Sequence, residues 1–294
     1  MDSKENAIAI RYNDDYSVVQ ANELIRSRQD SLTLLEAKLI RLAITQVVKE
    51  DTDLKTYSCK VSELAKFLDI SPSNVYRDIQ DLTRNLMKKS IFMKDTSQPS
   101  SRGKENYKIF HWIDYIEYTD GTLTFKLSEG LKPYLVGLDK FFTSYSYYYI
   151  KEASSTNAVR LYELLASYQK MCREPASNPN YTNVPIGPNE LIFTLDWLRE
   201  VLDCEEKYPS NKDFIRKVID RSIESIKEHT TMQPTYRIVK EGRRFKYIIF
   251  KLEPDEEEMS ETRKKMREIT KRYEERKKRA EEHKDYEEDD FYFM

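Results

Sequence analysis

The sequence contains few of the residues from which catalytic and metal sites are usually built. Among its 294 residues there are only six glycines, three cysteines and three histidines. No glycine lies in a GxxxxGKS/T pattern, so a nucleotide-binding phosphate loop is not indicated. The histidines form no HxH, HxxxH or HxxR pattern and the cysteines form no CxxC, which argues against a metal-dependent nickase, a tyrosine recombinase and a zinc site. We therefore predict no catalytic residue, no metal, no cofactor and no enzymatic activity.

Long apolar segments are absent as well. No run approaches the roughly 18 consecutive apolar residues that a membrane-spanning helix requires. The first 15 residues lack the basic segment followed by an apolar one that is typical of an export signal. Widely separated cysteines without a disulfide pattern favour a reducing compartment. The sequence thus predicts a cytoplasmic protein without a membrane partner.

The charge is close to balanced but unevenly distributed. The formal net charge is −2, whereas residues 254–294 alone carry 11 basic and 15 acidic residues, a net of −4. The remaining body has 38 basic and 36 acidic residues, a net of +2. A near-neutral body can still carry local basic faces, and phosphate binding depends on those faces rather than on the total charge. Nucleic acid is therefore not excluded as a partner.

Residues 32–127 show a pattern of helices followed by strands. Apolar spacing predicts an amphipathic helix over 32–48, with a capping box of Thr33 and Glu36. A short strand over 57–61 and a short helix over 62–68 follow. Ser71 and Pro72 suit the N-cap and first position of a second helix over 72–87. The stretch 61–87 therefore resembles a helix-turn-helix, although two ordinary packed helices would give the same pattern.

The residues after this helix predict strands and a wing. Strand-like segments occupy 91–94, 107–118 and 122–127, with a hairpin turn at Asp120-Gly121. The polar loop over 95–106, which contains Arg102 and Lys104, would form the tip of the wing.

The second half of the chain repeats the same order. Residues 195–203 match 61–69 at a constant offset of 134, including an Asp at 69 and at 203. A helix over 211–227 then matches the helix over 72–87 at an offset of 140. Strands over 234–239 and 245–252 flank a cationic hairpin tip. Between the two copies lie an extended aromatic segment, a helix and a polar loop, predicted at 141–150, 156–168 and 173–189.

These patterns predict an α+β fold with two tandem winged-helix domains. We expect an N-terminal arm at 1–15, a first winged-helix domain at 16–140 and a second at 141–253 that includes its leading linker helix. The remaining residues, 254–294, form a charged tail that is either a solvated helix or disordered. The tip of this tail, 285–294, combines five acids with aromatic residues, so an alternative is that it docks on a basic-rimmed apolar pocket of a partner.

Several segments in order resemble the iteron-binding, theta-type plasmid replication initiators of the RepB family. The most specific are AVRLYELL, LDWLREVL and DFIRKVI, preceded by LTLLEAKLIRLAI. The resemblance implies two winged-helix domains, the second of which reads repeated sites in the plasmid origin, while the first adds DNA contacts and mediates dimerisation. It also implies that monomers start replication, that dimers are inactive or autorepressing, and that the host initiator and replicative helicase are partners.

The candidate DNA contacts follow from the outward faces of the two second helices. We expect base contacts from the second unit first, because Arg and Lys can donate to guanine O6 and N7, and Arg216 also matches an arginine of the family's pattern. The predicted base-reading residues are Arg216, Lys217, Lys212, Arg221, Ser73, Asn74 and Arg77. The predicted phosphate or wing contacts are Lys240, Arg243, Arg244, Arg84, Lys88, Arg102 and Lys104. The simpler alternatives are that the charged faces are only solvated and that Ser73 and Asn74 only cap a helix.

The sequence therefore predicts a non-enzymatic, sequence-specific initiator that binds tandem repeats in double-stranded DNA, helps to open the origin and recruits host proteins. The alternative is a winged-helix transcriptional repressor without initiator activity. Tandem repeats of about two helical turns beside the coding sequence would favour the initiator, and a single palindrome in a promoter would favour the repressor.

Overall fold

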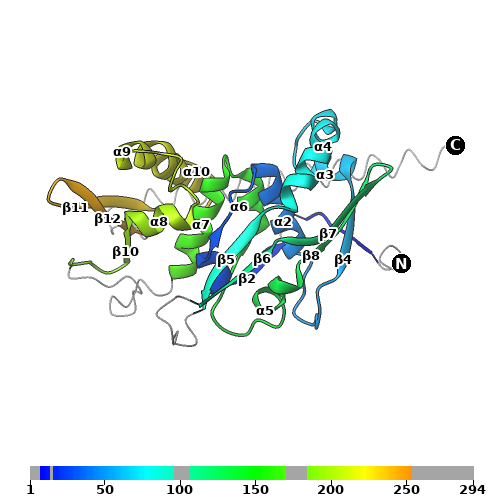
Figure 1. The fold of residues 1–294 in the computed structure, drawn as a ribbon, viewed down its shortest axis with the longest axis horizontal. Coiled ribbons are helices and arrows are strands. Elements are labelled where there is room, and N and C mark those ends of the chain that lie inside the picture. The colour runs from blue at the N-terminus through cyan, green and yellow to red at the C-terminus, as the bar shows by residue number, and fades with distance from the viewer. Residues whose placement is uncertain (1–6, 14–15, 96–105, 170–183, 253–294) are drawn as a thin grey trace.

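The computed structural model describes residues 7–13, 16–95, 106–169 and 184–252. Two helix-turn-helix units lie side by side and are joined by a central helix (Figure 1). The helices are α1 (Asn22–Arg26), α2 (Leu34–Ile44), α3 (Val61–Phe67), α4 (Pro72–Leu86), α5 (Lys132–Leu135), α6 (Tyr147–Glu152), α7 (Thr156–Tyr168), α8 (Leu195–Val201), α9 (Asn211–Phe214) and α10 (Arg221–His229). The strands are β1 (Ile8–Ala9), β2 (Ser17–Ala21), β3 (Arg28–Gln29), β4 (Thr56–Lys60), β5 (Ser90–Asp95), β6 (Asn106–His111), β7 (Ile113–Thr119), β8 (Thr122–Leu127), β9 (Phe142–Ser146), β10 (Glu190–Thr194), β11 (Thr235–Glu241) and β12 (Arg244–Lys251). Within the described residues, no helix has both the length and the apolar character needed to cross a membrane.

In the first unit, α3 contacts β4 and α4 contacts β7 of a sheet with the strand order β1-β4-β8-β7, while α2 contacts β2, α6 and α7. The predicted capping box at the start of α2 is confirmed: the Thr33 hydroxyl accepts from the Glu36 backbone N–H at 3.3 Å, and the Glu36 carboxylate accepts from the Thr33 N–H at 2.8 Å. Strand β1 lies within the segment expected to be an arm and pairs in parallel with β4. Part of this segment is therefore built into the first sheet.

The second unit has the same order of elements. Strand β10 leads into α8, the helical run over 211–229 follows, and the hairpin β11–β12 completes a sheet with the order β10-β12-β11. Between α9 and α10 the helix continues as a π-helical stretch over Ile215–Asp220. The second unit therefore pairs its strands as β4, β8 and β7 pair in the first unit.

The corners of the two helix-turn-helix motifs share an unusual backbone conformation. Asp69 and Asp203, which the sequence aligned at an offset of 134, have φ values of 55° and 51°. Few residues other than glycine adopt this left-handed conformation, and Asp does so more readily than most. The shared conformation supports the view that the two halves are copies of one unit.

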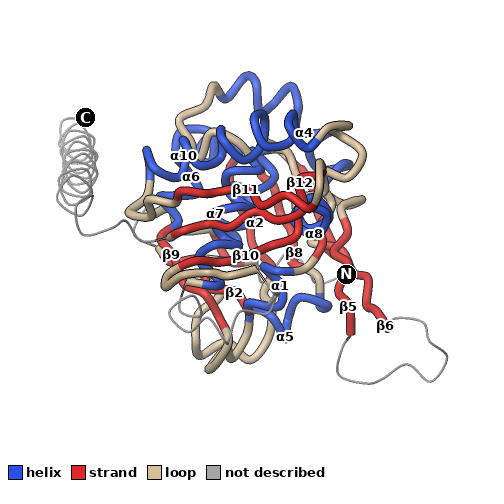
Figure 2. The backbone as a smooth tube through the Cα atoms, turned by 90° about the vertical axis from the view of Figure 1, so that its left-hand side faces the viewer, coloured by secondary structure: helices blue, strands red, loops and turns tan. Residues whose placement is uncertain are grey.

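The wing of the first unit differs from the prediction. Strands β5 and β6, which flank the loop over 95–106, pair with each other and with β3 in a separate three-stranded sheet. The hairpin that corresponds to β11–β12 is instead β7–β8, with Asp120-Gly121 at its turn. The predicted strand over 107–118 is therefore two strands in different sheets, separated at the fully buried Trp112. Figure 2 shows β5 and β6 projecting from the body as an arm.

The segment between the two units contains a second difference. The extended segment predicted over 141–150 is a strand only over β9, which pairs with β2 in an antiparallel two-stranded sheet. Ser146 then accepts a hydrogen bond from the Tyr148 N–H at 3.3 Å and starts helix α6. Strand β9 thus lies in a sheet with the first unit, and the domain boundary placed between 140 and 141 stays a prediction.

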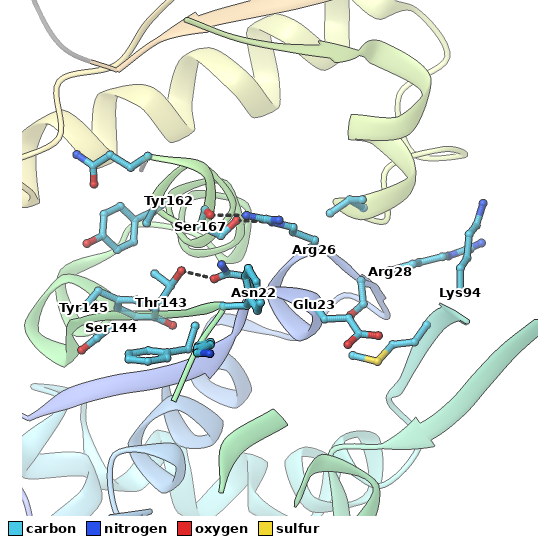
Figure 3. A pocket seen from close by; sticks show the side chains of 18 of the residues that line it. Asn22, Glu23, Arg26, Arg28, Lys94, Thr143, Ser144, Tyr145, Tyr162 and Ser167 are labelled. Atoms are coloured by element: carbon cyan, nitrogen blue, oxygen red, sulfur yellow. Dashed lines mark hydrogen bonds between the residues drawn. The ribbon is translucent and has the colours of Figure 1, made fainter. Parts of the chain in front are cut away.

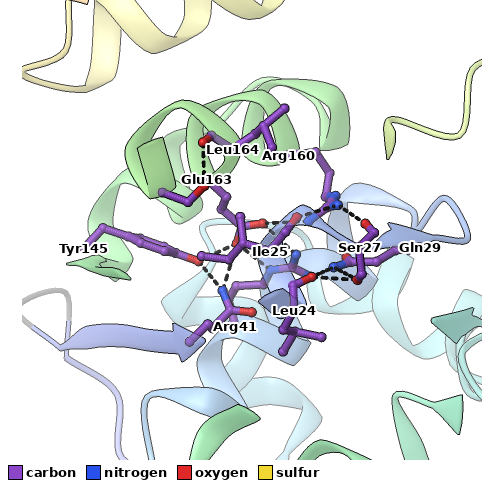
Figure 4. A network of polar contacts seen from close by, with 11 residues as sticks. Leu24, Ile25, Ser27, Gln29, Arg41, Tyr145, Arg160, Glu163 and Leu164 are labelled. Carbon is purple, nitrogen blue, oxygen red and sulfur yellow. Dashed lines mark hydrogen bonds and ion pairs between the residues drawn. The ribbon is translucent and has the colours of Figure 1, made fainter. Parts of the chain in front are cut away.

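Helix α7 carries a buried carboxylate at the centre of the molecule. Glu163 is fully buried and accepts two hydrogen bonds from the Arg41 guanidinium, each at 2.9 Å (Figure 4). Tyr145 and Gln20 also donate to it. Arg160 lies 3.4 Å from the same carboxylate and donates to the backbone carbonyls of Ile25 and Ser27. One carboxylate therefore ties α7 to α2, β2 and β9.

The surrounding charges set the protonation of this network. Burial alone would raise the pKa of Glu163, but the Arg41 and Arg160 guanidinium groups outweigh it and hold that pKa below its usual range. Burial lowers the pKa of Arg160 to about 10. The network is therefore ionised at neutral pH.

We expect Glu163→Gln to lower the free energy of unfolding by about 3–5 kcal/mol, because the buried Arg41 charge would lose its partner. Urea unfolding at pH 7 would measure this change, with Glu23→Gln on the exposed surface of α1 as the control. The pKa of Glu163 is lower in the folded state than in the unfolded state. The Glu163 carboxylate therefore contributes fully to the free energy of unfolding above its pKa in the unfolded state. This contribution is lost as the pH falls through its pKa in the folded state. The difference in free energy of unfolding between the wild type and Glu163→Gln should therefore decrease in acid. A difference that stays constant with pH would contradict an ionised Glu163 as the partner of Arg41.

Candidate nucleic-acid interface

Helix α4 presents a polar face opposite its buried stripe. Val75, Ile79, Leu82 and Leu86 are buried, as the spacing predicted. On the other side, Ser73, Asn74 and Arg77 are exposed, together with Tyr76. The Arg77 Nε donates to Asp78 at 2.8 Å, which holds the guanidinium at the surface. The predicted contact residues of the first unit thus share one solvent-facing surface.

The start of α4 is not capped as expected. Ser71 occupies the N-cap position and Pro72 the first turn, but the Ser71 side chain makes no capping hydrogen bond. Its hydroxyl lies 2.7 Å from the Ser73 hydroxyl instead. The N-cap position predicted for Ser71 and the first helical position predicted for Pro72 are therefore confirmed, but the Ser71 side chain does not cap the helix.

The corresponding helix of the second unit is capped by Ser210. The Ser210 Oγ accepts from the Asp213 N–H at 3.0 Å and donates to the Asp213 carboxylate at 2.8 Å. Asp213 also lies 3.2 Å from Arg216 and 3.9 Å from Lys217. The hydrogen bond from Ser210, followed by the Lys217 and Arg216 charges, holds the pKa of Asp213 below its usual range. One carboxylate therefore positions the two basic side chains expected to be most important.

Both of these basic residues fall in the π-helical stretch. Arg216 and Lys217 are exposed there, while Ile215, Val218 and Ile219 are buried below them. Single π-helical turns within α-helices occur frequently at functional sites. Lys212 and Arg221 are exposed on either side of the stretch and have no ion-pair partner within the described residues. The four predicted basic residues of this helix are therefore all available at the surface.

The tip of the β11–β12 hairpin is cationic. Gly242 at its turn has a φ of 61°, and Arg243 and Arg244 beside it are exposed. The Lys240 ammonium lies 5.0 Å from the centre of the Phe245 ring. Lys246 was not identified from the sequence, and it pairs with Glu241 at 2.6 Å. The hairpin thus presents three predicted cations next to one that is already neutralised.

The remaining predicted phosphate contacts are divided between described and undescribed residues. Arg84 and Lys88 are exposed near the end of α4, where Arg84 lies 3.9 Å from Asp81. Arg102 and Lys104 lie outside the described residues, in the loop between β5 and β6. Because that hairpin belongs to the separate sheet with β3, these two residues are not on the hairpin that corresponds to the wing of the second unit.

The candidate recognition helices, α4 and the helical run over 211–229, lie at the same edge of the molecule. In Figure 1, α4 and α9 are both at the top, and the hairpins β7–β8 and β11–β12 point toward opposite ends. Hydrogen bonds between the units fix this arrangement. The Ser31 N–H and hydroxyl donate to the Asp203 carboxylate at 3.1 and 2.7 Å. The Lys207 ammonium donates to the Ser31 hydroxyl and to the Asp203 carboxylate. Burial would raise the pKa of Asp203, but the Ser31 and Lys207 hydrogen bonds lower it below its usual range. The carboxylate is therefore ionised at neutral pH.

A cleft of about 1240 Å³ lies between the two units (Figure 3). Arg26 points across it to Ser167, with its guanidinium 3.7 Å from the centre of the Tyr168 ring. At its rim, Lys94 approaches Glu200 at 4.0 Å. None of the residues that line the cleft belongs to α4, to the helical run over 211–229 or to the hairpins β7–β8 and β11–β12. The cleft is thus separate from the candidate interface, and no group of His, Cys, Asp or Glu in the described part of the chain is arranged to bind a metal ion.

Together, these features define a protein with two winged-helix units. A family model described as "Initiator Replication protein, WH1" matches residues 17–166, and one described as "Initiator Rep protein, WH2" matches residues 194–252. The chain belongs to this family of plasmid replication initiator proteins. The first match extends through β9 and most of α7, which the sequence analysis had assigned to the second domain.

Two individual relatives agree with the family. A "Replication initiation protein" of Escherichia coli is 27% identical over 242 residues, which cover 81% of this chain and 70% of the relative. A "PI protein" of Escherichia coli is 25% identical over 233 residues and covers 70% of this chain and 72% of the relative. The solved WH1 domain of the MSBI1.176 replication protein, isolated from a multiple sclerosis patient, is 19% identical with a TM-score of 0.27 and covers 35% of this chain and 79% of that one.

The two helix starts provide a matched test of capping. We expect Ser210→Ala to lower the free energy of unfolding by about 1 kcal/mol, because its hydroxyl satisfies a backbone N–H at the helix start. Ser71→Ala should change it by less than about 0.5 kcal/mol, since that side chain makes no capping bond. Urea unfolding of the two variants measures both effects; equal losses would contradict the difference between the two caps.

Proposed function

We propose that this chain is a sequence-specific, double-stranded DNA-binding initiator that binds tandem repeats of a plasmid origin. The observation that supports this most strongly is the arrangement of two recognition helices at one edge, with four exposed basic side chains on the second. A single duplex along that edge would meet both helices and both hairpins. Winged-helix proteins of this kind insert the second helix of each motif into the major groove.

We assign base reading mainly to the second unit. Arg216 and Lys217 extend from the π-helical stretch and can donate to guanine O6 and N7, which is worth about 1–3 kcal/mol of discrimination for each good contact. Lys212 and Arg221 lie on the same exposed side of the helical run. In the free protein, Asp213 neutralises part of the positive charge of Arg216 and Lys217. In a complex with DNA, its carboxylate could accept a hydrogen bond from the amino group of a cytosine.

The cationic hairpin tip would hold the DNA backbone. Arg243 and Arg244 have no ion-pair partner within the described residues, so both guanidinium groups are available for phosphate or for the minor groove. Lys240 lies on the same strand end. Such contacts position the protein and give its binding a strong dependence on salt.

The later steps of initiation rest on membership of the family. Several bound copies would together supply the few kcal/mol that deformation of the origin requires, which would assist opening of adjacent DNA. The host replication initiator and the replicative helicase are the proposed partners, and a dimeric form would act as an autorepressor. We propose no catalytic step, no cofactor and a cytoplasmic location.

We expect Arg216→Ala to weaken binding to the plasmid's own origin repeats by about 1–3 kcal/mol, because the variant cannot donate a hydrogen bond to a base. Footprinting and titration of purified protein on DNA flanking the coding sequence measure the effect. Lys132→Ala is the matched control, because Lys132 is paired with Asp53 and belongs to α5, at the opposite edge in Figure 1. Equal affinities of the Arg216 variant and the wild type would refute the assignment. Protection of one palindrome rather than tandem repeats would favour a transcriptional repressor.

The hairpin tip is expected to change the salt dependence rather than the sequence preference. In the double variant Arg243→Ala, Arg244→Ala, the slope of log K against log salt should become shallower by about 0.9 for each DNA phosphate that the variant no longer neutralises. Titrations on repeat and unrelated DNA at several salt concentrations would show the same decrease in affinity on both. A decrease confined to the repeat would mean that these arginines read bases.

A further inference from the structure

The outward faces of the two second helices differ in one large side chain. Their buried stripes match at an offset of 140, so that Val75 corresponds to Ile215 and Ile79 to Ile219, whereas their N-caps Ser71 and Ser210 match at an offset of 139. The position of Arg216 therefore falls between those of Tyr76 and Arg77. Tyr76 has 40% of its surface exposed, although it is a large aromatic residue on a polar face. The first unit thus presents a phenol on the face from which the second presents its basic groups.

The two hairpins differ at one corresponding position. In β7–β8 the last pair before the turn is Thr119 with Thr122, and in β11–β12 it is Glu241 with Arg244. One pair further back, Tyr118 in the first hairpin therefore corresponds to Lys240 in the second. Tyr118 is 42% exposed. Tyrosine thus replaces a cation on the hairpin of the first unit.

The tip of the first hairpin also lacks the cations of the second. By the same pairing, Gly121 and Thr122 occupy the positions of Arg243 and Arg244. Gly121 has a φ of 75°, and a Cβ placed on it would lie 3.3 Å from the Tyr76 hydroxyl. The phenol of the recognition helix therefore reaches the turn of the hairpin. A larger residue at this turn would be strained by the backbone conformation and would crowd that hydroxyl.

We propose that the first unit contacts the DNA backbone through Tyr76 and Tyr118, and that these contacts do not depend on salt. The phenol hydroxyls donate to phosphate oxygens, while the rings lie against sugars or thymine methyl groups. A neutral phenol releases no condensed counterion when it meets a phosphate, unlike a lysine or an arginine. Tyr76 and Tyr118 therefore add to the binding a part that does not depend on salt and that fixes the position of the protein on the duplex.

DNA fits this surface better than a protein partner for two reasons. Tyr118 occupies the position at which the second unit presents Lys240, Tyr76 lies on the exposed face of α4, and α4 lies at the same edge as α9. Ser73, Asn74 and Arg77, which surround Tyr76 on α4, are polar donors rather than apolar residues. The inference rests on the proposed function, because it assumes that the edge binds a duplex.

The test is a salt titration of the full chain on its origin repeats. We expect Tyr76→Ala and Tyr118→Ala each to raise Kd about five- to tenfold at every salt concentration, with the slope of log K against log salt unchanged. Tyr76→Phe and Tyr118→Phe, which remove only the hydroxyl, should show a smaller increase. Tyr107→Ala is the matched control, because Tyr107 is 59% exposed on β6 and lies in the other sheet. All three tyrosines are exposed, and urea unfolding would confirm that the variants remain folded.

Other outcomes would overturn the inference. Unchanged Kd in both alanine variants would show that the first unit makes no such contact, and a changed salt slope would show that the contact is electrostatic. Altered self-association in sedimentation with unchanged DNA binding would make the surface a protein interface. Arg216→Ala distinguishes a failure of this inference from a failure of the proposed function. If Arg216→Ala weakens DNA binding and the tyrosine variants do not, only the inference about the tyrosines fails. If none of the variants weakens DNA binding, the proposed function fails as well.

Discussion

The arrangement of the whole molecule depends on the buried carboxylate of Glu163. Helix α7 contacts α1 and α2 of the first unit and α10 of the second, so its placement determines how the units face each other. The paired hydrogen bonds from Arg41 fix the axial position and rotation of α7 on α2. Arg160, which lies one turn earlier on α7, donates to the backbone carbonyls of Ile25 and Ser27 and so attaches α7 to the end of α1. A buried ion pair contributes little net stability compared with an apolar core, but it strongly disfavours packings in which a charge is left unpaired. The network therefore specifies one register of the central helix.

The two units share a fold but present different surfaces. In both, a buried apolar stripe places the recognition helix, and an Asp in the left-handed conformation forms the corner before it. The exposed positions are free to differ, because they bear no part of the packing. The second unit carries arginine and lysine on both its helix and its hairpin tip, whereas the first carries Arg77, Arg84 and Lys88 on and after α4 but tyrosine on its hairpin. One scaffold thus supports two different surfaces on the same edge, and only the second has a cationic hairpin tip.

Much of this fold was predictable from the sequence, since most of its elements are defined by local patterns. The helices over 72–86 and 156–168, the strand over 122–127 and the Asp120-Gly121 turn were placed within a residue or two. The role of β5–β6 was mistaken because the pairing of β3 with β5 joins segments about 60 residues apart and leaves no local signal. Helix α6 was missed because its aromatic residues are typical of strands, whereas its start is set by the Ser146 side chain. The candidate residues followed from helical spacing, from the cationic hairpin and, for Arg216, from the resemblance, so the exposure of these basic residues was predictable. The neutralising partner Asp213 and the neighbourhood of Tyr76 and Gly121 depend on side-chain positions and were not.

The contact between the units also explains why two similar motifs are not equivalent. Asp69 and Asp203 occupy the same corner, yet Asp69 is exposed, whereas Asp203 accepts hydrogen bonds from Ser31 of the first unit. Ser31 lies just before the capping box of α2, and α2 is the helix that carries Arg41. The corner of the second motif is therefore attached to the first unit close to the start of the helix that anchors α7. The second helix of this motif begins at Asn211, eight residues after that corner, and Arg199 holds the backbone between them by donating to the carbonyls of Glu205 and Tyr208. The position of this helix relative to α4 is therefore set by hydrogen bonds within the chain.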